Sequence, residues 1–195
     1  MPGARRFERG SDGGGWLAEL VRARGSELRE HTDAVADMAR SVALALGLDA
    51  EDRELVACAA ELHDVGKVAM PDAILAKRGP LDAVERALMD RHTIIGEAIV
   101  DAAPALRPVA ALVRASHERW DGSGYPDRLA GERIPLGARI VAVCDAFSAM
   151  VEERAYGEVL AEEAALAELR RCTGTQFDPR VVDAFCAVMA PARAA

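Results

Sequence analysis

Apolar side chains recur three and four residues apart along most of the chain, and no convincing segment alternates apolar and polar positions. This spacing places apolar side chains on one stripe of an α-helix. The first clear example is Val35, Met38, Ala39 and Val42. The pattern predicts an all-α bundle of about seven helices, at about 26–46, 51–64, from 82 past 95, 105–117, 137–150, 158–172 and 181–189.

Helix start signals support two of these bounds. Asp82 followed by Glu85 is the sequence of a capping box, in which the two side chains satisfy each other's backbone N–H groups. Asp178 before Pro179 is typical of an N-cap followed by the first helical residue. Residues 119–136 are dense in turn formers, so they predict a long loop.

The ends of the chain hold little that could be buried. Residues 1–15 combine three consecutive glycines with scattered charge, so we expect a disordered N-terminal lead there and a disordered tail at 191–195. The chain has 195 residues, of which 51% are apolar. That is enough for one globular domain over residues 16–190.

Charge and composition exclude several classes of protein. The 24 basic and 32 acidic side chains give a net charge of -8, and no long Lys/Arg block provides the basic surface that DNA or RNA binding needs. No apolar run approaches the roughly 18 residues of a membrane helix, and the N-terminus lacks a signal-peptide core. We therefore expect a cytoplasmic protein. Its four cysteines are widely spaced and indicate buried thiols.

The sequence contains four histidines, each in a different helical segment and in phase with the apolar stripe of that segment. They are His31, His63, His92 and His117. A single histidine of this kind is more often a hydrogen-bonded core residue. Four in phase, joined by Asp64 and Asp145 at comparable spacings, instead indicate a metal cluster.

Imidazole and carboxylate ligands without thiolates suit Fe, Mn, Zn or related divalent ions. His63 and Asp64 offer two ligands at one helix end, and a carboxylate there can bridge two ions. Two ions about 4 Å apart suit phosphate ester cleavage, because one activates water while both neutralise the phosphoryl oxygens. The residues therefore favour phosphodiester hydrolysis.

Four ordered segments carry a resemblance to a known family. They read ELHDVGK at 61–67, MPDAIL at 70–75, HERWDGSGYP at 117–126 and IPLGARI at 134–140. The series is similar to that of the HD-GYP family, a branch of the HD metal-dependent phosphohydrolases. The resemblance implies an HD-domain helical bundle that hydrolyses cyclic di-GMP, or a related cyclic dinucleotide, to the linear dinucleotide, with GMP as the product of a second cut.

The resemblance also implies roles for single residues. The implied metal ligands are Glu27, His31, His63, Asp64, His92, His117 and Asp145, with Glu27 matching a ligand of a third ion. The resemblance implies that these residues bind two divalent ions, or three if Glu27 binds one. It favours Fe or Mn over Zn or Mg. Lys67, Tyr125 and Arg154 match positions that bind the dinucleotide, and Asp64 and Lys67 are the implied catalytic residues. Without the motif, Lys67 and Arg154 read as surface charges, and Tyr125 fits a structural loop anchor equally well.

Three positions depart from the family pattern. Ser116 stands where the family has a second histidine, Ser148 replaces an aspartate, and Gly157 replaces a basic residue. Each change points to weaker metal or phosphate binding. Two alternatives therefore stay open: a module that binds nucleotide or a protein partner without turnover, and a phosphohydrolase for mononucleotides.

A cyclic dinucleotide is the expected small-molecule partner, with no DNA, RNA or membrane. The apolar stripe on the N-terminal helix suits a homodimer as well as it suits the core. We recognise no sensory segment, so we expect control by a regulatory partner protein, by expression level or by a region outside this chain.

Overall fold

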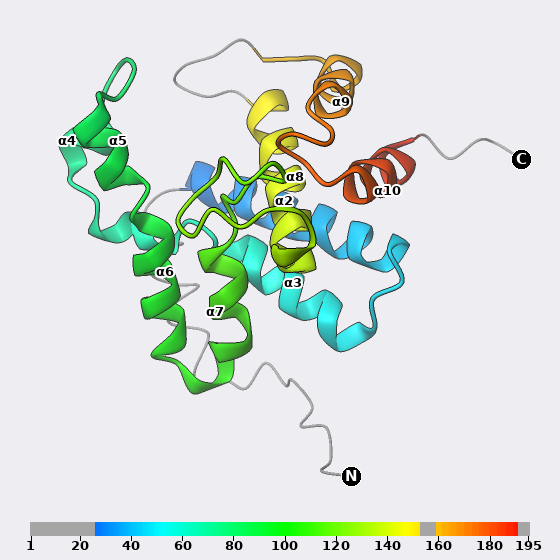
Figure 1. Cartoon of the computed structure of the whole chain (residues 1–195), viewed down its shortest axis with the longest axis horizontal. Helices are drawn as coiled ribbons and strands as arrows, with labels where there is room; N and C mark the ends of the chain where they lie inside the picture. The colour runs from blue at the N-terminus through cyan, green and yellow to red at the C-terminus, as the bar shows by residue number, and fades with distance from the viewer. Residues whose placement is uncertain (1–25, 153–158, 191–195) are drawn as a thin grey trace, which may run out of the picture.

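The computed structural model describes residues 26–152 and 159–190, with side chains described from residue 32 onward. The α-helices are α2 (Ser26–Ala45), α3 (Ala50–Leu62), α4 (Asp72–Leu75), α5 (Ala83–Met89), α6 (His92–Asp101), α7 (Arg107–Arg114), α8 (Leu136–Val151), α9 (Glu162–Arg171) and α10 (Pro179–Met189). Three 3₁₀ helices join them: η1 (Val65–Ala69), η2 (Pro104–Leu106) and η3 (Gly131–Arg133). Within these ranges no strand forms, which confirms the predicted all-α fold (Figure 1).

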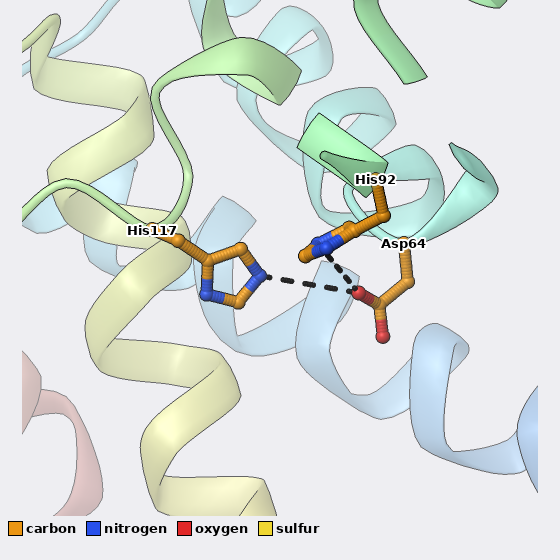
Figure 2. Close-up of side chains that lie close together, drawn as sticks. All are labelled: Asp64, His92 and His117. Carbon is orange, nitrogen blue, oxygen red and sulfur yellow. Dashed lines mark ion pairs between the residues drawn. The ribbon is translucent and has the colours of Figure 1, made fainter. Parts of the chain in front are cut away.

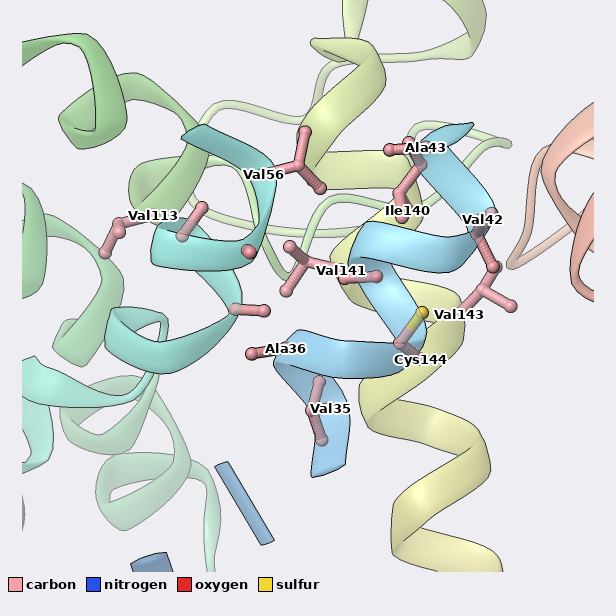
Figure 3. Close-up of a cluster of buried hydrophobic side chains, with 14 of the residues drawn as sticks. Val35, Ala36, Val42, Ala43, Val56, Val113, Ile140, Val141, Val143 and Cys144 are labelled. Atoms are coloured by element: carbon pink, nitrogen blue, oxygen red, sulfur yellow. The ribbon is translucent and has the colours of Figure 1, made fainter. Parts of the chain in front are cut away.

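The hydrophobic core lies where α8 packs against α2 and α3 (Figure 3). The predicted stripe of α2 is buried there, since Val35, Ala39 and Val42 have no exposed surface. Ile140 of α8 is buried as completely. Each large apolar side chain removed from water in this way contributes roughly 1.5–3 kcal/mol to folding. This packing fixes the position of α8, the helix that carries Asp145.

Two further groups of helices surround the core. The pair α6 and α7 packs together and against η1 and α3, while α9 and α10 pack against the far side of α8 (Figure 1). The start of η1, the start of α6, the turn after α7 and the middle of α8, at Asp145, thus approach one another beside the core. None of the helices in the described ranges combines the length and apolarity needed to cross a membrane.

The capping signals are confirmed. The Asp82 carboxylate accepts hydrogen bonds from the N–H groups of Val84 and Glu85, and the Glu85 carboxylate accepts one from the Asp82 N–H. The Asp178 carboxylate caps α10 by accepting a bond of 2.8 Å from the Arg180 N–H. These bonds satisfy N–H groups that have no partner within the helix.

The predicted helix from 82 past 95 is wrong as one element, because the chain forms α5 and α6 with a break between them. At the break His92 Nδ1 donates to the Met89 carbonyl and Thr93 Oγ1 donates to the Asp90 carbonyl. Side-chain bonds to these carbonyls compete with continuation of the helix. The expected stripe is also lost, since Val84 is 79% exposed.

Two other bounds need correction. The predicted helix at 51–64 ends at Leu62, so His63 and Asp64 lie in the turn after α3. The predicted helix at 105–117 ends at Arg114, which places His117 in the turn that follows α7. His63, His92 and His117 therefore lie at or just beyond helix ends and not within a helical stripe.

Candidate metal centre

Asp64 is brought beside His92 by a close packing of main chains. An ideal Cβ atom on Gly66 would lie 1.9 Å from the His92 carbonyl oxygen and 2.6 Å from the Gly96 nitrogen. Only a glycine leaves room for such an approach. Gly66 therefore lets η1 lie directly on the first turn of α6, so that Asp64, which precedes η1, lies beside His92, the first residue of α6.

Asp64, His92 and His117 converge from three separate elements (Figure 2). His92 Nε2 lies 3.4 Å from Asp64 Oδ1, and His117 Nε2 lies 3.9 Å from the same oxygen. One potential ligand atom from each of the three residues lies within 4.8 Å of the other two. This spacing allows one ion to contact all three residues.

His63 and Asp145 join the other side of Asp64. His63 Nε2 lies 3.6 Å from Asp64 Oδ2 and 3.6 Å from Asp145 Oδ1. The two oxygens of Asp64 therefore face different imidazoles, Oδ2 toward His63 and Oδ1 toward His92 and His117. That arrangement suits a bridging carboxylate, the role that the sequence predicts for Asp64.

Backbone carbonyls fix the orientation of two imidazoles. His63 Nδ1 donates to the Ala60 carbonyl and His92 Nδ1 donates to the Met89 carbonyl, each at 2.8 Å. A carbonyl can only accept, so Nδ1 carries the proton in both rings. Nε2 is then free to offer its lone pair, which is the usual arrangement of a metal-binding histidine.

The atoms facing one another are buried without hydrogen bonds. Nε2 of His63, His92 and His117 and Oδ1 of Asp64 have no hydrogen-bond partner among the described residues. Buried polar atoms in folded proteins are nearly always paired, so four such atoms at one place require an explanation. Divalent cations bound between them would satisfy all four, and the donor set of imidazole and carboxylate fits such ions.

The pKa values of Asp64 and His92 agree with this use of the residues, whereas His63 must first lose a proton from Nε2. Burial is the largest influence on His92 and lowers its pKa to about 4, despite the opposing charge of Asp64. Burial also disfavours protonation of His63, but Asp64 and Asp145 outweigh it and raise the pKa to about 9. For Asp64, His63 and Lys67 outweigh burial and hold the pKa well below its usual range. At neutral pH and without an ion, Asp64 is charged, His92 is neutral and His63 carries a proton.

Lys67 and Tyr125, two predicted substrate-binding residues, also lie at the cluster. Lys67 Nζ lies 2.5 Å from Asp64 Oδ2, so the ammonium group forms an ion pair with a predicted metal ligand. The ring of Tyr125 stacks on that of His117, with 5.3 Å between the ring centroids and 9° between the planes. Tyr125 thus contacts a predicted metal ligand directly. This contact also fits the structural alternative, in which Tyr125 anchors its loop.

Two of the positions that depart from the family pattern, Ser116 and Ser148, lie in the described part of the chain, and each donates a hydrogen bond to a neighbour in sequence. The buried hydroxyl of Ser116 donates to the Val113 carbonyl at 2.9 Å, within its own turn. Ser148, also buried, contacts the Glu152 carboxylate one turn further along α8. Neither interaction involves the three-residue set of Asp64, His92 and His117.

Some predicted residues fall outside the described part of the chain. The backbone of Glu27 and His31 lies in α2, but their side chains are outside it, as are Arg154 and Gly157 altogether. Their roles stay predictions. The remaining predicted ligands, His63, Asp64, His92, His117 and Asp145, are brought together.

Sequence reasoning assigned no role to Glu118 and Asp90. Glu118 is only 4% exposed, and its carboxylate accepts the N–H groups of Asp127 and Leu129. Its place in the segment HERWDGSGYP, directly after His117, was the available signal. Oδ1 of Asp90 is buried without a hydrogen-bond partner among the described residues, and no pattern in the sequence marks it.

Comparisons with known proteins agree with this geometry. A family model described as HD domain matches residues 16–181. The cyclic di-GMP phosphodiesterase response regulator RpfG of Xanthomonas campestris pv. campestris is 44% identical over 170 residues, covering 86% of this chain and 45% of RpfG. The 3'3'-cGAMP-specific phosphodiesterase 2 of Vibrio cholerae is 41% identical over 169 residues, covering 86% of this chain and 32% of the relative.

A solved structure shares the fold. The HDG"Y"P protein Bd1817 from Bdellovibrio bacteriovorus aligns with a TM-score of 0.67 at 18% identity, covering 83% of this chain and 52% of that chain. The chain spans less than half the length of the two curated relatives described above.

Proposed function

Since the chain belongs to the HD domain family, in its HD-GYP branch, we propose that it is a metal-dependent phosphodiesterase that hydrolyses cyclic di-GMP or a related cyclic dinucleotide. The supporting observation is the convergence of three unpartnered imidazole nitrogens on the carboxylate of Asp64. The relatives that are phosphodiesterases for cyclic di-GMP and 3'3'-cGAMP support the substrate class.

The proposed ligands divide into two sets that share Asp64. One set is His63, Asp64 and Asp145, with His31 as a further ligand, and the other is Asp64, His92 and His117. Glu27 would add a third ion, and we expect Fe or Mn, which a mixed set of imidazole and carboxylate donors accepts. Divalent ions held there supply Lewis-acid polarisation of the phosphoryl group and acidification of a water molecule.

The side chains of this protein have separate tasks in the reaction. Asp64 holds the two ligand sets in fixed relation, because each of its oxygens faces a different imidazole. Lys67 lies within reach of the same carboxylate and supplies a positive charge against the charge that develops on the phosphoryl oxygens. Tyr125 borders the site beside His117, and Arg154 is the proposed second cation for the phosphates.

Ser116 favours one alternative function, a module that binds nucleotide without turnover. Its hydroxyl is held by the Val113 carbonyl, so the second set keeps three protein ligands. Three protein ligands with an open position are also typical of catalytic metal sites, where water or substrate completes the shell. We therefore place hydrolysis first.

Hydrolysis by the purified chain tests the proposal. With Fe(II) or Mn(II), the chain is expected to convert cyclic di-GMP or 3'3'-cGAMP to the linear dinucleotide. Asp64→Asn is expected to lower the rate about 100-fold or more, since even the residues that support ligands are worth about 10–100-fold. Asp183→Asn, an exposed position on α10, is the matched control. Binding of the dinucleotide without any product would instead identify the non-hydrolytic module.

The remaining partners stay predictions. The proposal is consistent with a homodimer, with a regulatory partner protein and with a cytoplasmic location, but none of these follows from it.

A panel of mononucleotides tests the other alternative, a phosphohydrolase for mononucleotides. The proposal expects the chain to hydrolyse each mononucleotide more slowly than the cyclic dinucleotides.

A further inference from the structure

The ring of His117 is held differently from the rings of His63 and His92. Those two donate from Nδ1 to carbonyls in their own turns, and their side chains are 1% and 2% exposed. His117 follows the end of α7, and its side chain is 24% exposed. Within the described ranges no hydrogen bond ties its ring to a backbone carbonyl. Another contact must therefore set the direction of His117 Nε2.

That contact is made by the aromatic ring of Tyr125. It lies parallel to the imidazole, with 9° between the planes and 5.3 Å between the centroids. The ring of His92 meets the same imidazole edge-on, at 4.9 Å and 74°. A stacked ring and an edge-on ring together oppose rotation of His117, and both arrangements are favourable for aromatic groups.

The main chain brings Tyr125 to this position. The Tyr125 N–H donates to the carbonyl of His117 itself at 3.3 Å. An ideal Cβ on Gly124 would lie 2.6 Å from Glu118 Cα and 2.4 Å from the Arg119 nitrogen. The loop can therefore lie on the backbone next to His117 only because a glycine precedes Tyr125.

Glu118 holds the other side of the same loop. One carboxylate oxygen accepts the Asp127 N–H at 2.7 Å and the other accepts the Leu129 N–H at 3.0 Å. The Asp127 carboxylate is in turn bound by the Arg114 guanidinium through two bonds, of 2.6 and 2.8 Å. A buried carboxylate that accepts two backbone N–H groups is a strong anchor, because charged acceptors form the stronger hydrogen bonds.

We infer that Tyr125 is a positioning residue that aims the imidazole of His117 by stacking, and that Glu118 is the anchor that keeps Tyr125 in place. The ring of Tyr125 performs this task, and its hydroxyl is not required. The inference rests on the proposed function only in treating His117 as a ligand. It differs from a role for Tyr125 limited to contact with substrate, which would leave the direction of the His117 imidazole, and hence the affinity of its ligand set for Mn(II), unchanged when Tyr125 is replaced.

Proton NMR of the four imidazole Cε1–H groups in the metal-free full chain tests the inference. Replacing each histidine in turn assigns its signal. A stacked aromatic ring shifts the nearby protons of His117 to lower frequency, so Tyr125→Leu is expected to move the His117 signal to higher frequency. Tyr125→Phe, the matched control, keeps the ring and is expected to keep the shift. The His63 signal reports whether each variant is folded, because the ring of His92 also lies near that of Tyr125, at 6.3 Å between centroids.

Glu118→Gln tests the anchor while leaving Tyr125 intact. The amide oxygen can accept from one loop N–H, but the amide nitrogen presents a donor to the other, so one of the two bonds is lost. The loop then holds Tyr125 less firmly, and the His117 signal is expected to move toward its position in Tyr125→Leu. An unchanged His117 signal in Tyr125→Leu would overturn the stacking. An affinity for Mn(II) that is unchanged in Tyr125→Leu, or lowered equally in Tyr125→Phe, would overturn the positioning role. An unchanged signal in Glu118→Gln would overturn the anchor. Failure to hydrolyse the dinucleotides would count against the proposed function and would not alter these shifts.

Discussion

Nε2 of His92 lies 3.4 Å from Oδ1 of Asp64, and both atoms are acceptors. The proton of His92 is on Nδ1, where it is donated to the Met89 carbonyl, and burial lowers the pKa of His92 to about 4. At neutral pH two lone pairs therefore face each other away from water. A cation between them turns an unfavourable contact into two favourable ones.

Metal binding is expected to release protons near neutral pH. His63 has a pKa raised to about 9 by Asp64 and Asp145, so below that pH a proton must leave before Nε2 can bind an ion. Apparent affinity for Mn(II) should therefore rise about tenfold per pH unit from pH 7 to 9 and level off above it. Asp64 and His92 add no proton in this range, because their pKa values lie below it.

Calorimetric titration at pH 7.5 in two buffers with different heats of ionisation counts the released protons. A value near one proton for the site that contains His63 agrees with the expectation. The same affinity at pH 7 and pH 9 would show that His63 is not a ligand.

Gly66→Ala is expected to damage the site and the fold together. The added Cβ would meet main-chain atoms of His92 and Gly96, which cannot move without displacing α6. We expect a loss of about 3 kcal/mol of unfolding free energy, in the range of severe overpacking, with weaker metal binding. Gly96→Ala is the control, because its Cβ would meet the side chain of Val113 at 3.0 Å and needs a smaller adjustment. Equal denaturation midpoints for the two variants would contradict the packing described for Gly66.

Lys67→Met is expected to separate substrate binding from metal binding. The lysine pairs with Asp64 Oδ2 and, in the proposed reaction, with a phosphoryl oxygen. We expect kcat/KM for the cyclic dinucleotide to fall about 100-fold, the usual effect of removing one group that stabilises developing charge. Metal affinity should not fall, because the substitution removes a competitor for Asp64. A weaker affinity for Mn(II) with unchanged kcat/KM would reverse these assignments.

Ser116→Ala is expected to leave the metal affinity unchanged. The hydroxyl donates to the Val113 carbonyl and is not directed at the cluster. Loss of this buried hydrogen bond should lower stability by about 1 kcal/mol. Thermal unfolding and Mn(II) titration of the same preparation measure both effects. A marked loss of affinity would identify Ser116 as a ligand after all.

The sequence predicted the parts of the fold that depend on local signals. The capping residues Asp82, Glu85 and Asp178 and the buried stripe of α2 follow from side-chain chemistry within a few positions. The break between α5 and α6 could not be predicted in this way. It involves His92 Nδ1 taking the Met89 carbonyl, and the spacing of apolar residues does not mark that bond.

In the candidate site, too, the sequence predicted the residues marked by local signals and missed a residue whose role depends on the folded loop. His63, Asp64, His92, His117 and Asp145 were predicted from their types and approximate phase, although the helical phase itself was wrong for three of the histidines, which lie at or beyond helix ends. Glu118 was missed because its role depends on where the loop returns. Its partners are nine and eleven residues away along the chain.

The metal content of anaerobically purified protein tests the central claim most directly. Elemental analysis of the wild-type chain, Asp64→Asn and the control Asp183→Asn should find two divalent ions per chain in the wild type and the control. Asp64→Asn should retain neither ion firmly, because each proposed set uses one oxygen of Asp64. The absence of bound metal in all three proteins, or equal metal content in the wild type and Asp64→Asn, would contradict the account.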